Sequence, residues 1–428
     1  MMMMRRRCRF VLKKRINLIF MNTIFIQIAS YRDPELIPTI KDCISKAKYP
    51  DNLSFGICWQ HSKDDAWDNV DEFTALANFT IMDVPWKESN GVCWARSHLQ
   101  KMWKGEKYTL QLDSHHRFIQ HWDEELIEMV GLCNSEKPII TSYAGSYDPS
   151  GSVLLNNKPY KLCGEHFNKE GNVRICSKTI DNFKDLISPI RGRFVSGHFY
   201  FTLGKHCEEC KYDPFFYFDG EELRLSILSY TNGYDIFHPH KLIIWHEYTR
   251  KLRVKHWDDF DNKNKERGVI TKEWYKMNDD SCARLRCFLN HKIVGIYGLP
   301  ENYTEERKVN IRTLNDYEKY AGINFELRKL HPDCVSGVEP PVIYTDDTWI
   351  SDIEIEYNYI LTIPPAENFK FIFVGIETNS GELLFRKDLT EYVDTLVVNF
   401  KSIKTPYKWI YWVYDREKEW DKRVDTLL

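Results

Sequence analysis

A regular alternation of apolar runs and helical patterns between residues 23 and 144 is the feature that most constrains the fold. Residues 35–48 follow a turn that ends in Pro34, which suits a helix start, and residues 89–103 repeat apolar side chains at helical spacing. Apolar runs of strand length lie at residues 23–29, 54–60, 78–84, 107–113 and 138–144. Strands joined by crossover helices form a parallel sheet with helices on its faces, so we predict an α/β domain.

The ends of two predicted strands carry polar residues that suit a ligand site. In parallel α/β sheets, ligands bind outside the carboxyl ends of the strands. Residues 30–33 follow the first strand, and Asp113 ends the fourth. The chain has neither a GxGxxG motif nor a P-loop motif, so we expect no dinucleotide cofactor and no P-loop.

The sharpest chemical signal is the DxH pattern formed by Asp113 and His115 at the end of the fourth strand. If extended geometry persists, residues i and i+2 point to the same side, and both side chains can share one cation. A carboxylate with an imidazole suits Mn²⁺ or a related divalent ion, which can neutralise a diphosphate leaving group. The alternative is that Asp113 caps a turn and His115 lies on the surface. His116 competes with His115 only if the turn changes the side-chain direction, and we favour His115.

Two further candidates lie downstream. Gly220 follows an aromatic run, and Glu221 and Glu222 then open a predicted helix, where a carboxylate can lie beside a sugar hydroxyl. Acids in a first helical turn are also favoured simply by the helix dipole. His246 closes an apolar run, which predicts a buried position or a strand end. A histidine in such a place is more often a structural residue than a ligand.

The pattern changes in the second half of the chain. Residues 145–200 are polar and irregular, which predicts an excursion that shapes the substrate site, and residues 329–341 have the composition of a linker. Beyond them, β-branched and aromatic runs split by turns predict a small all-β module resembling a sandwich. The predicted parts are therefore a basic tail at 1–22, an α/β domain at 23–330 and a β-rich module at 335–428.

The β-rich module can act in several ways. Trp349, Trp409 and Trp412 can bind a glycan or an acceptor if they are exposed. They can instead fill the core of the module, or the module can mediate oligomerisation.

Charge and cysteine content narrow the class of protein. The net charge is −3, and the first fifteen residues hold seven Arg and Lys without an acid, so the rest of the chain carries −10. An acidic body is a poor binder of nucleic acid. The twelve cysteines are scattered, which fits free thiols in a reducing compartment. Only Cys207 and Cys210 have metal-type spacing, and a single CxxC is a weak zinc signal.

The N-terminal segment does not predict a membrane span. An apolar stretch at residues 16–29 follows the basic tail, but it is shorter than the roughly 18 residues that a span requires. No small-residue cleavage site follows it. We therefore expect a cytoplasmic protein, and Met21 is an alternative start.

Several motifs taken together resemble a known family. In chain order they are ASYRDPEL, Ala95-Arg96, LQLDSHHRF, FVSGHFYF, DGEE and WHEY. This set is similar to the cytoplasmic hydroxyproline N-acetylglucosaminyltransferases of glycosyltransferase family 60, and more distantly to the polypeptide GalNAc-transferases. The resemblance covers roughly residues 23–325 and leaves out the all-β tail. It implies a GT-A fold, which is a Rossmann-like nucleotide-sugar transferase domain, and a retaining enzyme.

The resemblance also implies residue roles. Asp113, His115 and His246 would hold Mn²⁺ or another divalent cation, and Glu221 and Glu222 would hold hydroxyls of the donor sugar. Together with Asp113, the residues implied to line the donor site are Ser30, Arg32, Arg96, Ser196, Gly197 and His198. The GalNAc-transferases have Asn where this chain has Glu222, so the preference for an N-acetyl sugar does not follow from the motif.

The expected reaction is metal-assisted transfer with retention, in which the cation and Arg96 stabilise the departing UDP and a hydroxyl attacks from the same face. UDP-GlcNAc is the favoured donor, and the acceptor is a hydroxyproline or Ser/Thr protein, or a glycan. One alternative is a metal-dependent nucleotidyltransferase or hydrolase, but no second carboxylate cluster suits a two-metal site. The other is a carbohydrate-binding or scaffold protein with a degenerate transferase domain. The intact set of Asp113, His115 and His246 argues against such degeneration.

Overall fold

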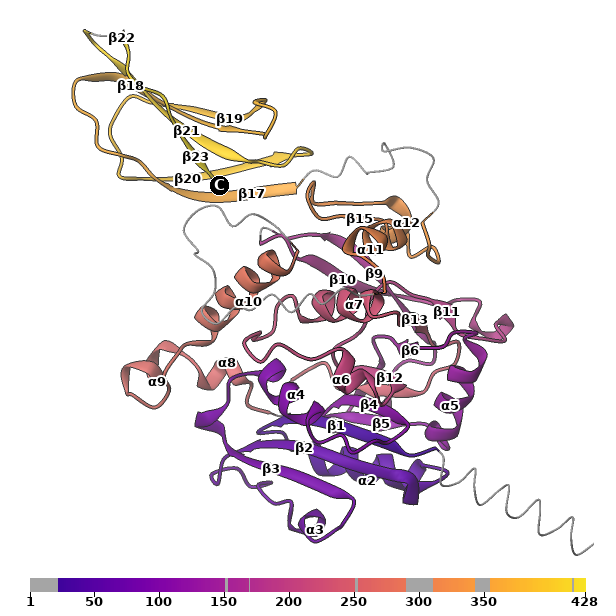
Figure 1. The fold of residues 1–428 in the computed structure, drawn as a ribbon. Helices are drawn as coiled ribbons and strands as arrows, with labels where there is room; N and C mark the ends of the chain where they lie inside the picture. Colours follow the sequence, from indigo (N-terminus) through magenta and orange to yellow (C-terminus); the bar gives the residue numbers. More distant parts are fainter. Residues whose placement is uncertain are drawn as a thin grey trace, which may run out of the picture.

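The structure is a computed structural model that describes residues 22–150, 153–168, 170–250, 253–289, 311–342, 355–417 and 419–428. The expected basic tail, except for residue 22, and Trp349 lie outside these residues. An α/β part built on a large sheet occupies the N-terminal portion of the chain, and a strand-rich part follows it at the C-terminal end (Figure 1). None of the helices in the described ranges is long and apolar enough to cross a membrane.

The α/β part is organised around an eight-stranded sheet with the order β11-β13-β6-β12-β4-β1-β2-β3. Its strands are β1 (Ile24–Tyr31), β2 (Leu53–His61), β3 (Phe79–Pro85), β4 (Tyr108–Asp113), β6 (Pro138–Thr141), β11 (Ile190–Arg191), β12 (Phe199–Leu203) and β13 (Asp235–His238). The predicted α/β class, followed by a β-rich region, is therefore confirmed. The predicted strand order of alternating β and α elements holds through β6.

The sheet is mixed, whereas the sequence predicted a parallel one. Strands β1 to β4 run parallel, but β12 lies between β4 and β6 and is antiparallel to both. Residues 145–200 were also predicted to be irregular in structure, and this is wrong, while their expected role in shaping the substrate site stays a prediction. They include the hairpin of β9 (Tyr160–Phe167) and β10 (Val173–Thr179), together with β11 and the start of β12. The polar composition of this region hid strands that need only one buried face.

Successive residues of two strands of the large sheet, β6 and β13, face two different cores. In β6, Ile139 packs into one core and Ile140 into the other. In β13, Ile236 and Phe237 divide in the same way. Alternation with a period of two sends neighbouring side chains to opposite faces of a sheet. The sheet is therefore buried on both sides, and polar residues inside its strands, such as Gln27 and Gln111, are fully buried.

Helices cover both faces of the sheet. On one side lie α2 (Leu36–Lys46) and α5 (Trp122–Leu132), and on the other α7 (Glu221–Thr231) packs with α11 (Leu314–Ala321). Helix α4 (Val92–Gln100) contacts β1 and β2. The remaining helices are α3 (Asp71–Thr74), α6 (His206–Glu209), α8 (His256–Asp259), α9 (Asn262–Glu266), α10 (Trp274–Phe288) and α12 (Pro332–Ser336).

A small second sheet brings distant parts of the chain to the carboxyl end of β4. It has the order β5-β14-β7-β8, with β5 (His116–Phe118), β7 (Gly145–Asp148), β8 (Val153–Leu154) and β14 (Ile244–His246). Strand β5 begins three residues after β4 ends, and His246 of β14 pairs with His116 of β5. The pairing therefore places the end of β14 beside the turn that carries Asp113 and His115.

The stretch at residues 329–341, predicted to be a linker, is packed structure instead. It contains β16 (Lys329–Leu330), which pairs with β15 (Ile323–Asn324), and helix α12, which contacts β9. Cys334 is fully buried there. Pro332 starts a short helix and Gly337 ends it, so this stretch resembled a linker in composition.

The C-terminal strands form two sheets around a separate core, as predicted for a sandwich. One sheet pairs β17 (Ile355–Thr362) with β20 (Thr395–Ser402). The other contains β18 (Phe369–Glu377), β19 (Leu383–Leu389), β21 (Lys408–Asp415), β22 (Glu419–Trp420) and β23 (Val424–Leu427). Trp409 belongs to the core between them, whereas Trp412 is half-buried and its ring contacts that of Trp420 at a tilt of 34°.

Candidate active site

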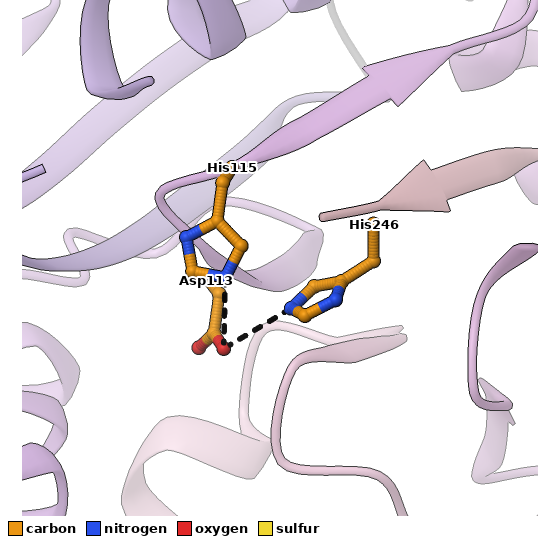
Figure 2. Close-up of side chains that lie close together, drawn as sticks. All are labelled: Asp113, His115 and His246. Atoms are coloured by element: carbon orange, nitrogen blue, oxygen red, sulfur yellow. Dashed lines mark ion pairs between the residues drawn. The ribbon is translucent and has the colours of Figure 1, made fainter. Parts of the chain in front are cut away.

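Three side chains with metal-ligating atoms meet at the carboxyl end of β4 (Figure 2). The Asp113 Oδ2 atom lies 3.5 Å from His246 Nε2 and 3.8 Å from His115 Nε2. One ligand atom from each residue lies within 4.8 Å of the others. Asp113 ends β4, His115 lies in the following turn and His246 ends β14. The preference for His115 over His116 agrees with this cluster.

The state of His246 fits a cation. Its side chain is buried, and neither ring nitrogen has a hydrogen-bond partner. Burial lowers the pKa of His246 well below its ordinary value, so the imidazole is neutral and keeps a lone pair for a ligand. Buried polar atoms nearly always have a hydrogen-bond partner, so a buried ring in which both nitrogens lack one needs an explanation. A divalent ion held by Asp113, His115 and His246 provides one.

Asp33 orients His115, a role that the sequence analysis did not assign to it. The His115 Nδ1–H group donates to Asp33 Oδ2 at 2.7 Å, and the Ser114 hydroxyl donates to the same oxygen at 2.7 Å. Burial alone would raise the pKa of Asp33, but His115 and the other donors lower it to about 2. The only sequence signal for Asp33 was its place after β1, because the carboxyl ends of β1 and β4 are neighbours in the sheet.

Arg253 is a second residue that the sequence did not single out. Its Nη2 atom lies 3.0 Å from His115 Nε2, and its Nη1 atom lies 3.5 Å from Asp33 Oδ2. It follows β14 by seven residues, in a stretch without a strong pattern. No motif in the sequence separates it from the other basic residues nearby.

Arg96 contacts Asp113 of the cluster and joins it to a second acid. Its Nη2 group donates to Asp113 Oδ1 at 2.7 Å, and its Nη1 group donates to Glu221 Oε1. Tyr212 also donates to Glu221 Oε1, at 3.0 Å. Burial would raise the pKa of Asp113, but His246, Arg96 and His115 hold it well below its ordinary value. Asp113 is therefore a carboxylate whose Oδ1 is committed to Arg96 and whose Oδ2 faces the two histidines.

Glu222 is held differently from Glu221. Its Oε1 accepts from the Gly197 N–H at 2.8 Å, and its Oε2 accepts from the Tyr143 hydroxyl at 2.5 Å. Burial raises the pKa of Glu222 to about 7, although both hydrogen bonds oppose the change. A methyl group added to Gly197 would lie 2.9 Å from a carboxylate oxygen of Glu221, so a larger residue here would have to displace the Glu221 side chain.

The loop of residues 196–198, which leads directly into β12, reaches the cluster. The ring of His198 lies 4.4 Å from that of His246, centroid to centroid. The Ala144 N–H donates to His198 Nε2 at 3.2 Å, and Ser196 Oγ lies 3.2 Å from the Nδ1 atom. Burial lowers the pKa of His198 well below its ordinary value. A neutral imidazole therefore lies beside the metal-type cluster.

Arg32 directly follows β1, as predicted, whereas Ser30 was predicted to follow the strand and lies within it, at its carboxyl end. The Ser30 hydroxyl is buried and has no hydrogen-bond partner. Arg32 forms ion pairs with Asp65 at 2.7 Å and Asp259 at 2.9 Å. Its guanidinium therefore links the loop after β2 to helix α8.

Cys207 and Cys210 are buried free thiols. In the part of the chain that the structure describes, they belong to no group of three metal-type ligands.

Comparison with known proteins gives a family match over most of the chain. The model of the family described as "Glycosyltransferase (GlcNAc)" matches residues 23–78 and 67–326. A search of curated proteins gives no match.

Two glycosyltransferases are among the solved structures that the chain resembles. GalNAc-T7 with UDP, GalNAc and Mn²⁺ is 16% identical with a TM-score of 0.43, and the likeness covers 62% of this chain and 50% of that one. TarS residues 1–349 from S. aureus with UDP-GlcNAc is 12% identical with a TM-score of 0.36, over 61% of this chain and 71% of that one. At these scores, neither likeness says what this chain binds.

Proposed function

Because the chain belongs to the GlcNAc glycosyltransferase family, we propose that it is a metal-dependent retaining transferase. It moves a sugar, with GlcNAc favoured, from a UDP-sugar to the hydroxyl of a protein or glycan acceptor. A protein acceptor would offer the hydroxyl of a hydroxyproline, serine or threonine side chain.

The observation that carries this proposal is the arrangement of Asp113, His115 and His246 at the carboxyl ends of the strands. One carboxylate oxygen and one nitrogen from each of two imidazoles converge there, and the His246 nitrogens are buried without partners. A divalent ion bound at this place supplies positive charge for a departing diphosphate. Ligands of open α/β sheets bind at this same edge.

In this proposal, the surrounding residues position the metal ligands and bind the donor. Arg96 occupies Asp113 Oδ1 and so keeps Oδ2 aimed at the two histidines. Asp33 holds the proton of His115 on Nδ1, which leaves Nε2 facing the site. In this proposal Ser30, Arg32 and the 196–198 loop line the donor side. Glu222 accepts hydrogen bonds from hydroxyls of the donor sugar. Glu221 does so through the carboxylate oxygen that does not bind Arg96.

Retention needs no protein nucleophile in this proposal. The acceptor hydroxyl attacks the anomeric carbon from the face that UDP leaves, and a phosphate oxygen of UDP takes its proton. The protein contributes by holding donor and acceptor together and by presenting fixed charges, which act strongly where water is excluded.

The test is UDP release from a panel of UDP-sugars, with Mn²⁺ and with EDTA. We expect slow Mn²⁺-dependent hydrolysis of one donor by the wild type, and its loss in Asp113→Ala. Asp51→Ala is a matched control, because Asp51 is exposed and lies outside the cluster. If no donor is bound or hydrolysed by the wild type, the nucleotide-sugar proposal is refuted, and a glycan-binding protein with a transferase-like fold becomes the function to test.

We also propose a reducing, cytoplasmic compartment. It is supported by the free state of all cysteines among the described residues, most of which are buried.

A further inference from the structure

The guanidinium of Arg253 lies where a metal ion would contact His115. Its Nη2 atom is 3.0 Å from His115 Nε2, the nitrogen that faces Asp113 and His246. Its Nη1 atom is 3.5 Å from Asp33 Oδ2. The side chain is only 16% exposed. A positive charge therefore sits among Asp33, His115 and the acids of the cluster.

The chemistry of arginine determines the tautomer of His115. A guanidinium has donors only, so Arg253 donates and His115 Nε2 accepts. The ring proton is then on Nδ1, from which it is donated to Asp33 at 2.7 Å. This tautomer is the one that a metal ligand needs, with Nε2 bare and the other nitrogen bonded to a carboxylate. The imidazole is thus prepared for a metal, but its lone pair is occupied by Arg253.

One lone pair cannot serve two partners. A bond from Arg253 to His115 Nε2 and a bond from that nitrogen to a metal ion therefore exclude each other. The two cations also repel each other at this distance. The arginine itself is incompletely satisfied, because its Nε group is buried without a hydrogen-bond partner. The carboxylate of Glu247, 3.7 Å from that Nε, is a second partner within reach.

We propose that Arg253 is a placeholder cation, which occupies the His115 end of the metal site and must be displaced by an incoming divalent ion. This inference rests on the metal site of the proposed function. It makes Arg253 a positioning residue that acts through His115: it holds the ligand in the correct tautomer and weakens metal binding. On displacement the guanidinium moves toward Glu247, whose carboxylate then faces the positive charge of the arginine.

The test is direct binding of Mn²⁺ in the absence of nucleotide, by calorimetry or by the EPR signal of free Mn²⁺. Arg253→Gln removes the charge and keeps most of the length. Since a hydrogen bond that involves a charged group no longer has to be broken, we expect binding about tenfold tighter than in the wild type. Arg250→Gln is the matched control, because Arg250 is exposed, lies on the same segment and packs on Trp257. We expect a much smaller change there.

A second variant guards against a folding defect. In Arg253→Ala, added guanidinium ion at millimolar concentration should fill the vacated place and weaken Mn²⁺ binding again, without affecting the wild type. If Arg253 only supported the fold, its removal would lower the affinity for Mn²⁺ instead of raising it. Added guanidinium would then not weaken Mn²⁺ binding by the variant. Equal or weaker Mn²⁺ binding by folded Arg253→Gln would overturn the proposal.

Asp113→Ala separates this inference from the proposed function. If the wild type binds Mn²⁺ and Asp113→Ala does not, the metal site stands, and the Arg253 variants decide on the placeholder alone. If the wild type does not bind Mn²⁺, or if Asp113→Ala binds Mn²⁺ as well as the wild type does, the metal site and the placeholder role of Arg253 are both refuted.

Discussion

Replacing Asp33 by asparagine should weaken metal binding, although Asp33 is not a metal ligand. All three hydrogen bonds to this side chain are donated to it. The Glu35 N–H donates to Oδ1 at 2.9 Å, and Ser114 and His115 both donate to Oδ2 at 2.7 Å. An amide has one oxygen and one NH₂ group, so either orientation of an asparagine side chain at this position brings a donor against a donor. The structure therefore requires a carboxylate here.

The expected loss follows from what Asp33 does for His115. Without the carboxylate, the ring is free to place its proton on Nε2 and to rotate away from Asp113. Loss of such a supporting partner typically weakens metal binding about 10- to 100-fold, or roughly 1.4 to 2.7 kcal/mol. The measurement is the Mn²⁺ dissociation constant of Asp33→Asn against the wild type.

Asp123→Asn is the matched control for this experiment. Asp123 is also buried and accepts two backbone N–H groups, from Lys48 at 2.6 Å and Tyr49 at 2.9 Å, but it lies outside the cluster. We expect it to destabilise the fold and to leave Mn²⁺ affinity unchanged. A folded Asp33→Asn protein that binds Mn²⁺ as tightly as the wild type would show that the Asp33–His115 hydrogen bond does not prepare the ligand.

Two further variants test other parts of the site. His246→Leu should abolish Mn²⁺ binding yet change the free energy of unfolding in EDTA by no more than about 1 kcal/mol, because no hydrogen bond to the His246 ring is lost; a much larger loss in EDTA would mean that the ring is paired. Glu222→Gln should flatten the pH dependence of stability. Because burial raises the pKa of Glu222 from 4.5 to about 7, its contribution is present below about pH 4.5 and is lost as the pH rises to 7, by up to about 3 kcal/mol. Thermal unfolding at pH 5 and pH 8 measures this, and equal pH dependence in both proteins would contradict the burial argument.

The strand ends illustrate how far sequence reasoning reaches. Asp113 and His115 were identified from their position after an apolar run, because adjacent residues at a strand end stay adjacent in the fold. The opening of α7 at Glu221 was likewise predicted from a glycine followed by two acids. His246 was assigned a buried strand end from its apolar run, but its role as a ligand came only from the family resemblance.

What the sequence by itself determined is the local part of this protein. Period-two and helical patterns report which face of an element is buried, so they predicted the α/β order, the C-terminal strands and the DxH turn. Only the tertiary structure decided which ends meet. Asp33 and Arg253 contact His115 from 82 and 138 residues away. Strand β12 enters the middle of the sheet antiparallel to its neighbours, and β14 pairs with β5 to deliver His246. Such pairings depend on packing between whole elements, and no local pattern records them.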